Sequence, residues 1–133
     1  MTKQLLGLDI GTTRTGVALA PAGVKIAAAL TTLDMDEDFL DRLDALAAEH
    51  SPELIVIGYP RNQQGETTAQ TEFVEGEARK IEERGYEVVF QDESVTSVVA
   101  ERNLSQRQPS HTKADIDAEA ARIILQDYLE LNR

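Results

Sequence analysis

An apolar run at residues 54–57, Leu-Ile-Val-Ile, constrains the fold more than any other part of the chain. It follows Pro52 and ends at Gly58, which bounds it as a short strand. Successive residues of a strand point to opposite sides, so this strand carries apolar side chains on both faces. Such strands are typical of the buried centre of a parallel sheet. The sequence therefore predicts an α/β domain whose sheet is covered by helices.

Shorter apolar runs indicate the other strands. Residues 4–10, 15–20 and 24–30 follow one another with Gly, Thr and Pro turn signals between them, which predicts a three-strand antiparallel meander. Residues 86–90 form a further run and predict the fifth strand. We therefore expect a five-stranded mixed sheet made of this meander plus two parallel strands.

Amphipathic periodicity predicts helices between and after these strands. Apolar residues recur at helical spacing over 36–49, and the same pattern follows a loop at 59–68. Two more helices are expected at 95–104 and from about 115 to 131. The connection at 105–113 holds no large apolar side chain, which predicts a mobile segment.

Composition limits the possible function classes. The chain has 133 residues, which fits a single domain over 1–133. The absence of cysteine excludes disulfides, thiolate zinc sites and cysteine nucleophiles. Two histidines, His50 and His111, are too few for a metal site built from imidazole. No apolar stretch suits a signal peptide or a membrane span, so we expect a cytoplasmic protein with no membrane contact.

The net charge argues against one class of partner. Lys and Arg total 13 against 24 Asp and Glu, which gives a net charge of −11. Such a charge keeps a protein soluble and repels polyanions at long range. Any interaction with nucleic acid must therefore depend on local cations or on bound metal ions.

The first candidate motif is an acid inside an otherwise apolar strand, followed by a hairpin turn. Asp9 is followed by Gly11, Thr12, Thr13 and Arg14. Exposed N–H groups and hydroxyls beside a carboxylate suit a phosphate together with its metal ion. The alternative is a hairpin turn whose aspartate only accepts hydrogen bonds from the backbone. The burial expected for Asp9 favours the functional interpretation.

Acidic residues recur at two later points. Asp92 and Glu93 are expected in a loop after the fifth strand, where Asp92 could instead cap the following helix. Asp115 fits a capping box with Thr112, whereas Asp117 begins the stripe that should cover the sheet. That stripe continues through Ala121, Ile124, Tyr128 and Leu131. The face that begins at Asp115 continues through Glu119, Arg122 and Gln126 and is expected to be solvated.

These motifs, in this order and spacing, resemble the YqgF/RuvX family. The resemblance covers nearly the whole chain and rests on Leu8–Gly11, Ile57–Asn62 with Gly65, Asp92–Glu93 with Thr96, and Lys113–Asp117. It implies a ribonuclease H-like fold and the activity of a Holliday junction resolvase or a pre-16S rRNA nuclease. The sequence departs from the family pattern at Ser94, where arginine is common, and at Tyr59, where leucine is usual.

The resemblance also implies a catalytic site. Asp9, Glu93 and Asp117 match the family's three carboxylates, which would bind two Mg²⁺ or Mn²⁺ ions about 4 Å apart and hydrolyse a phosphodiester. The implied partners are pre-rRNA, ribosome-assembly intermediates or branched DNA, bound by a monomer or a homodimer. The candidate substrate-binding residues are Gly11, Thr12, Thr13, Arg14, Arg61, Arg107 and Lys113.

Two other functions remain open from the sequence. The run from Asp9 to Thr13 also resembles the first phosphate loop of the actin and sugar-kinase superfamily, which would make the chain an ATP-binding module. That superfamily binds nucleotide between two such domains, and this chain has room for one. The weak basic character also allows a nuclease-like scaffold that binds RNA or protein without cleaving.

Overall fold

The computed structural model describes residues 4–21, 23–62, 64–93 and 112–131. In these ranges five strands form one sheet with the order β3-β2-β1-β4-β5. The strands are β1 (Gln4–Ile10), β2 (Arg14–Pro21), β3 (Ala28–Asp34), β4 (Pro52–Pro60) and β5 (Val88–Glu93). Strand β1 is antiparallel to β2 and parallel to β4, β2 is antiparallel to β3, and β4 is parallel to β5. The predicted mixed sheet is confirmed.

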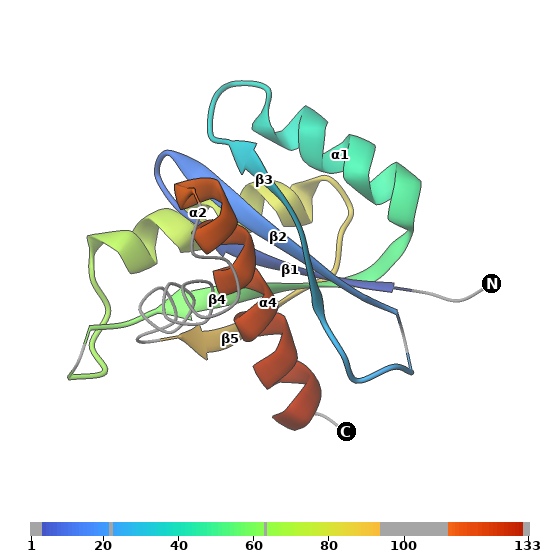
Figure 1. Ribbon diagram of the computed structural model, residues 1–133. Helices are drawn as coiled ribbons and strands as arrows, with labels where there is room; N and C mark the ends of the chain where they lie inside the picture. Colours follow the sequence, from blue (N-terminus) through green and yellow to red (C-terminus); the bar gives the residue numbers. More distant parts are fainter. Residues whose placement is uncertain (1–3, 22, 63, 94–111, 132–133) are drawn as a thin grey trace.

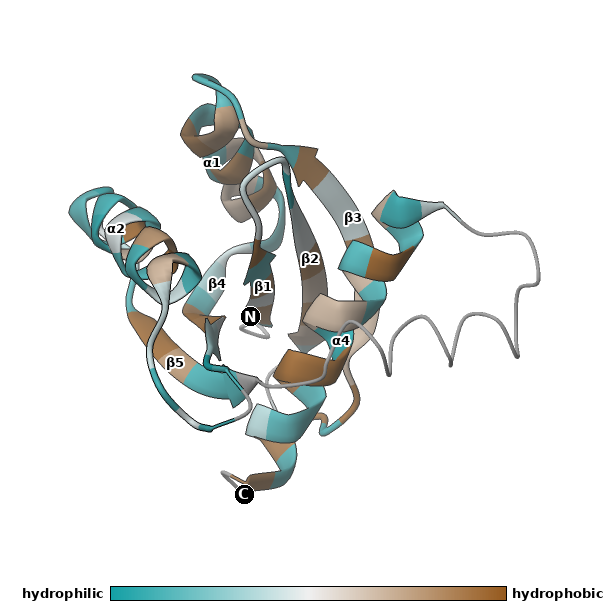
Figure 2. Cartoon of the chain, turned by 90° about the vertical axis from the view of Figure 1, so that its left-hand side faces the viewer, coloured by the Kyte–Doolittle hydropathy of each residue, from teal (hydrophilic) through white to brown (hydrophobic). Residues whose placement is uncertain are grey.

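Helices cover both faces of this sheet. They are α1 (Phe39–His50), α2 (Ala69–Glu83) and α4 (Lys113–Leu131). Figure 1 shows α4 crossing the strands on one face, and Figure 2 shows α1 and α2 together on the other. In β4, Ile55 and Ile57 pack with residues of α1 and α2 in one hydrophobic core, called the α1/α2 core. Val56 packs with residues of α4 in a second core, called the α4 core. The two-sided apolar run therefore fills both cores, as the sequence predicts.

Helix ends follow local sequence signals. Thr68 and Thr71 form a capping box at the start of α2, and Gly85, with a φ of 98°, follows its end. Helix α1 begins at Phe39, three residues later than the predicted 36, and its N-cap Asp38 makes no side-chain capping bond. None of the helices in the described part of the chain is long and apolar enough to cross a membrane.

The third strand lies four residues later than the predicted 24–30. The Gln126 side chain of α4 accepts a hydrogen bond from the Ala27 N–H at 2.9 Å and donates one to the Lys25 carbonyl at 2.9 Å. These bonds hold the segment before β3 against the helix instead of against β2. Val24 and Ile26 are consequently exposed, and an apolar run alone did not distinguish them from a strand.

Two predicted loops are partly strand. Strand β4 continues through Tyr59 and Pro60, and β5 continues through residues 91–93, because each pairs with the other in parallel register up to Pro60 and Glu93. The polar side chains of the second segment suggested a loop, but backbone pairing does not require apolar side chains. The predicted helix at 95–104 and residues 105–111 of the predicted mobile connection lie outside the described residues.

Two glycines allow α4 to lie close to the sheet. A Cβ on Gly16 of β2 would collide with the backbone carbonyl of Asp117, and a Cβ on Gly7 of β1 would lie 2.7 Å from the Leu125 Cβ. Helix and sheet backbones therefore approach more closely here than ordinary side chains permit. This approach fixes both the height of α4 above the sheet and its position along it.

We expect Gly16→Ala to destabilise the fold by about 3 kcal/mol, because the added methyl group must push the α4 backbone away from the sheet. Urea denaturation measures the free energy of unfolding. Gly76→Ala in α2 is the matched control: no heavy atom lies within 4 Å of its Cβ position, so the variant should gain about 0.5–1 kcal/mol in helix stability. Equal effects of the two substitutions would contradict the close approach.

Candidate metal and nucleic-acid site

Asp9 lies near the end of β1 on the face covered by α4. Leu5 belongs to the α4 core and Gly7 contacts Leu125, so strand alternation places Asp9 on that same face two residues further on. Its backbone partner on β2 is Gly16. Asp9 is partly buried, so this carboxylate lies at the boundary between the α4 core and the surface.

Asp117 also lies next to Gly16, although it belongs to the last helix. It lies in the second turn of α4, where its backbone carbonyl packs on Gly16, the partner of Asp9. Asp9 and Asp117 thus come from positions 108 residues apart and flank one glycine. The predicted orientation of Asp117 toward the sheet is confirmed, and its role as a metal ligand stays a prediction.

Arg14 neutralises Asp117. Its Nε donates a hydrogen bond to the Asp117 Oδ2 at 2.7 Å, and the two side chains are 30% and 24% exposed. Arg14 is the first residue of β2 and shares the α4 face with Gly16 by alternation. A half-buried carboxylate is costly without a charge partner, which explains why a guanidinium occupies this place.

Asp115 has the capping role that its spacing predicts. Its side chain accepts a hydrogen bond from the Thr112 N–H at 3.0 Å, and its own N–H donates to the Thr112 hydroxyl at 3.2 Å. Asp115 is exposed, whereas Asp117 is partly buried. The two acids at the start of α4 therefore have separate positions and separate partners.

The helix face led by Asp115 is less solvated than expected. Glu119 is 2% exposed and accepts two hydrogen bonds from Arg122, at 2.9 Å and 2.7 Å. This pairing raises the pKa of the Arg122 guanidinium. Helix α4 contacts all five strands, so its buried arc is wider than one apolar stripe. At its far end Leu131 is 72% exposed, contrary to its predicted place in the stripe.

Glu93 is the last residue of β5, where its backbone pairs with Pro60. Strands β1, β4 and β5 are mutually parallel, so their carboxyl ends lie at one edge of the sheet. Two strand spacings of about 4.8 Å separate the backbones of β1 and β5. This edge brings the backbone of the third predicted carboxylate to the same side of the molecule as Asp9.

Arg61, just after β4, lies at this same edge. Its Nε donates to the Asp92 carboxylate at 3.0 Å, and its guanidinium carbon lies 4.8 Å from the centre of the Tyr59 ring. Tyr59 packs edge-on against Phe90 at 5.1 Å and donates a hydrogen bond to Glu75. Desolvation and the Glu75 carboxylate raise the pKa of Tyr59. Arg61 is thus held in place by a carboxylate and an aromatic face.

In the turn between β1 and β2, one of the N–H groups predicted to bind phosphate forms a hydrogen bond within the turn instead. The Gly11 N–H donates to the Arg14 carbonyl at 3.0 Å, and a Cβ on Gly11 would lie 2.6 Å from that oxygen. Thr12 and Thr13 are exposed, as is Lys113 at the start of α4. Phosphate binding by these three residues stays a prediction, and Arg107 lies outside the described residues.

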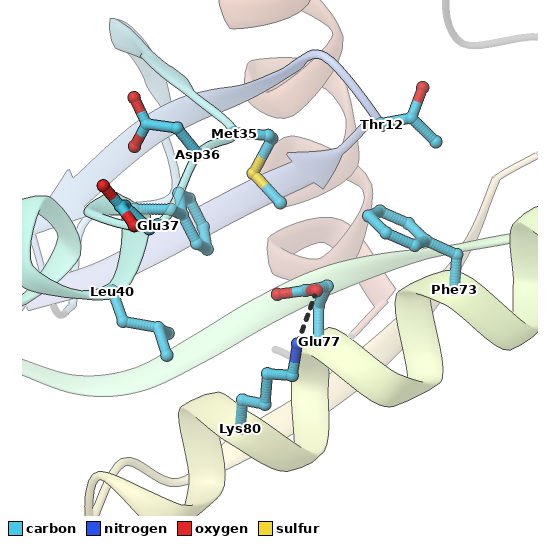
Figure 3. Close-up of a pocket in the computed structure, with 9 residues that line it drawn as sticks. Thr12, Met35, Asp36, Glu37, Leu40, Phe73, Glu77 and Lys80 are labelled. Atoms are coloured by element: carbon cyan, nitrogen blue, oxygen red, sulfur yellow. Dashed lines mark hydrogen bonds and ion pairs between the residues drawn. The ribbon is translucent and has the colours of Figure 1, made fainter.

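A pocket of about 300 Å³ lies on the opposite side of the sheet, between α1 and α2. Figure 3 shows Met35, Leu40 and Phe73 around it, with the Lys80–Glu77 ion pair at one side and Thr12 at its rim. Its lining contains no residue of α4. The sheet therefore separates Asp9 and Asp117 from this pocket.

The described carboxylates have the chemistry that a hard divalent cation requires. Asp9 and Asp117 carry carboxylate oxygens, the kind of ligand that Mg²⁺ and Mn²⁺ prefer, and the cationic Arg14 already neutralises Asp117. Within the described residues no three acidic or histidine side chains are grouped closely enough to hold a metal ion. Glu93, described here through its backbone, is the predicted third ligand.

The fold is similar to that of two solved resolvases. T. thermophilus RuvC in complex with Holliday junction substrate has a TM-score of 0.58 and 15% identity, covering 97% of this chain and 94% of that chain. Fowlpox virus resolvase with its Holliday junction DNA has a TM-score of 0.59 and 12% identity, covering 100% of both. The architecture is therefore the ribonuclease H-like fold of RuvC-type resolvases, as the sequence predicts.

The sequence comparisons are more specific. The family model for RuvX, described as Holliday junction resolvase, matches residues 3–131. A Chloroflexus aurantiacus protein is 39% identical over 97% of this chain and 88% of its own length, and a Synechocystis protein is 37% identical over 100% and 92%. Both are named "Putative pre-16S rRNA nuclease". The chain belongs to the RuvX family.

We expect Thr112→Ala to lower the free energy of unfolding by about 1 kcal/mol, because the substitution removes the side-chain cap at the start of α4. Asp115→Ala should cost the same or less, since it removes the reciprocal bond. Urea denaturation measures both values. Unchanged unfolding midpoints in both variants would contradict the capping box.

Proposed function

We propose that this protein is a metal-dependent nuclease that hydrolyses phosphodiester bonds in structured nucleic acid. The observation that carries the proposal is that Asp9 pairs with Gly16 in the sheet while the backbone of Asp117 packs on the same glycine, in a chain of the RuvX family. The ion pair with Arg14 compensates the charge of Asp117, but it does not explain why Asp9 lies at the same glycine. Shared coordination of divalent cations is a reason that the family membership supports.

Asp9, Glu93 and Asp117 would hold Mg²⁺ or Mn²⁺. When bound, the ions supply an activated water and stabilise the leaving oxygen of the phosphodiester. The protein's own contribution is the placement of the carboxylates on rigid elements: Asp9 on a central strand, and Asp117 on a helix fixed by the glycine contact. The ATP-binding alternative loses its support because the match to the RuvX family extends over residues 3–131.

Local cations would hold the substrate against the overall negative charge. Arg61 lies at the carboxyl edge of the sheet, and Lys113 is exposed at the start of α4. Charge-assisted hydrogen bonds from such groups position a phosphate backbone without reading its sequence. Bound divalent ions would add positive charge at the centre of the site. The nucleic acid would then be attracted only to the surface around the proposed metal site, although the protein as a whole is acidic.

We propose a structured substrate, either the 5′ end of a 16S rRNA precursor or a branched DNA junction. The names of the curated relatives support the first, and the substrates bound in the two structural neighbours support the second. A role on the rRNA precursor would place the protein in the cytoplasm with ribosome-assembly intermediates. Cleavage of both substrates in matched salt with Mn²⁺ or Mg²⁺ would decide between them.

We expect Asp9→Asn and Asp117→Asn each to lower metal-dependent cleavage by at least about 100-fold, because each removes a negatively charged ligand. Initial rates on labelled precursor RNA and on a four-way junction measure the effect. Asp115→Asn is the matched control: it should keep wild-type cleavage, because Asp115 is an exposed capping residue.

Two results would contradict this proposal. Wild-type activity in Asp9→Asn with unchanged metal dependence would remove Asp9 from the site. Tight binding of either nucleic acid by the wild-type protein without cleavage, at any concentration of Mn²⁺ or Mg²⁺, would identify a non-cleaving scaffold instead of a nuclease.

We expect Arg61→Gln to weaken substrate binding and to reduce the slope of log K against log salt by about 0.9 on duplex DNA, the value for one lost phosphate contact. Fluorescence anisotropy over a salt series measures the slope. Arg84→Gln is the control, because Arg84 follows the end of α2 and pairs with Asp41 and Asp44 of α1, away from the candidate site. Identical slopes for wild type and Arg61→Gln would remove Arg61 from the interface.

A further inference from the structure

We propose that Arg14 and the divalent cation compete for the Asp117 carboxylate, which makes Arg14 a positioning residue that sets metal affinity. In this proposal Arg14 neutralises Asp117 in the metal-free protein and leaves it when metal binds. The inference rests on the proposed function, because it assumes that Asp117 is a metal ligand. The proposal adds Arg14 as a competitor of the metal ion, a role that binding of metal by three carboxylates does not require.

The contact itself carries the proposal. The Arg14 Nε lies 2.7 Å from the Asp117 Oδ2, a charge-assisted hydrogen bond of ordinary length. Both side chains are less than one-third exposed, so water screens the pair only in part. Arg14 is anchored in β2, opposite Asp34 of β3 in the strand register, and its guanidinium therefore reaches Asp117 from a rigid element.

A bound divalent ion would oppose this contact. Mg²⁺ binds carboxylate oxygens at about 2.1 Å, closer than any hydrogen-bond donor. A guanidinium on the same oxygen would then lie within a few ångströms of a doubly charged ion and be repelled by it. Metal binding must therefore weaken the Arg14–Asp117 bond, and by linkage that bond must weaken metal binding.

Once released from Asp117, Arg14 would also be available to bind a phosphate group of the substrate. The guanidinium of arginine suits phosphate oxygens as well as it suits a carboxylate. A released Arg14 would lie beside the loaded site, where a phosphate group is to be held. The cation that protects the metal-free site would then become a phosphate contact only after the metal has arrived.

Calorimetric titration with Mn²⁺ alone tests the competition without any measurement of activity. We expect Arg14→Gln to bind Mn²⁺ with a Kd roughly three- to tenfold lower than that of the wild-type protein. Arg84→Gln is the matched control, since it also removes a guanidinium from carboxylates but at a distant place, and its Kd should equal that of the wild type. An unchanged or higher Kd in Arg14→Gln would overturn the competition.

A second measurement uses the unaltered protein. In the metal-free state the Arg14 Nε–H should give a resolved, slowly exchanging signal in a ¹H–¹⁵N spectrum, assigned by its loss in Arg14→Gln. Addition of Mg²⁺ should shift or broaden this signal, because the bond to Asp117 is lost. A signal that stays unchanged while Mg²⁺ saturates the site would show that Arg14 and metal bind Asp117 together.

Asp117→Asn separates the two proposals. If wild type binds Mn²⁺ and Asp117→Asn does not, the metal site stands, and the Kd of Arg14→Gln alone decides the competition. If wild type and Asp117→Asn bind Mn²⁺ equally, Asp117 is not a ligand, and both the proposed metal site and the competition are wrong.

Discussion

The α4 backbone packs directly on Gly16 of β2, and this contact determines how the last helix lies on the sheet. It lets a helix from the end of the described chain lie directly on the strands that begin it. The α4 core forms around this contact, and the Gln126 side chain ties the segment before β3 to the same helix. The absence of a side chain at Gly16 thus lets α4 lie on the sheet, with the backbone of Asp117 beside the strand partner of Asp9.

Arginines near the candidate site are already engaged with acids. Arg14 pairs with Asp117, Arg61 with Asp92, and Arg122 with the buried Glu119. In this protein, whose net charge is −11, these three guanidinium groups are therefore already occupied by carboxylates. In the proposed function, nucleic acid would displace these acids or depend on the charge of bound metal, which would make metal loading and substrate binding parts of one equilibrium.

Local pattern was sufficient to predict part of this molecule. The two-sided apolar run at 54–57, the meander and the orientation of Asp117 follow from side-chain periodicity, which acts over a few residues. The position of β3 does not, because Gln126 competes for that segment from about 100 residues away in sequence. The Arg14–Asp117 pair spans 103 residues, and no spacing in the sequence indicates it. The capping box of Asp115 was predictable because both partners lie within one helical turn.

The distance in sequence between Asp9 and Asp117 has a consequence for protein synthesis. Translation produces the strands before α4, so the sheet can form while the face that carries Asp9 is still uncovered by the helix. Chains interrupted before residue 117 contain one carboxylate of this pair and no helix to cover the face on which it lies. A nascent or truncated polypeptide without α4 therefore lacks Asp117 and its ion pair with Arg14, and the proposed metal site can form only after residue 117 has been translated.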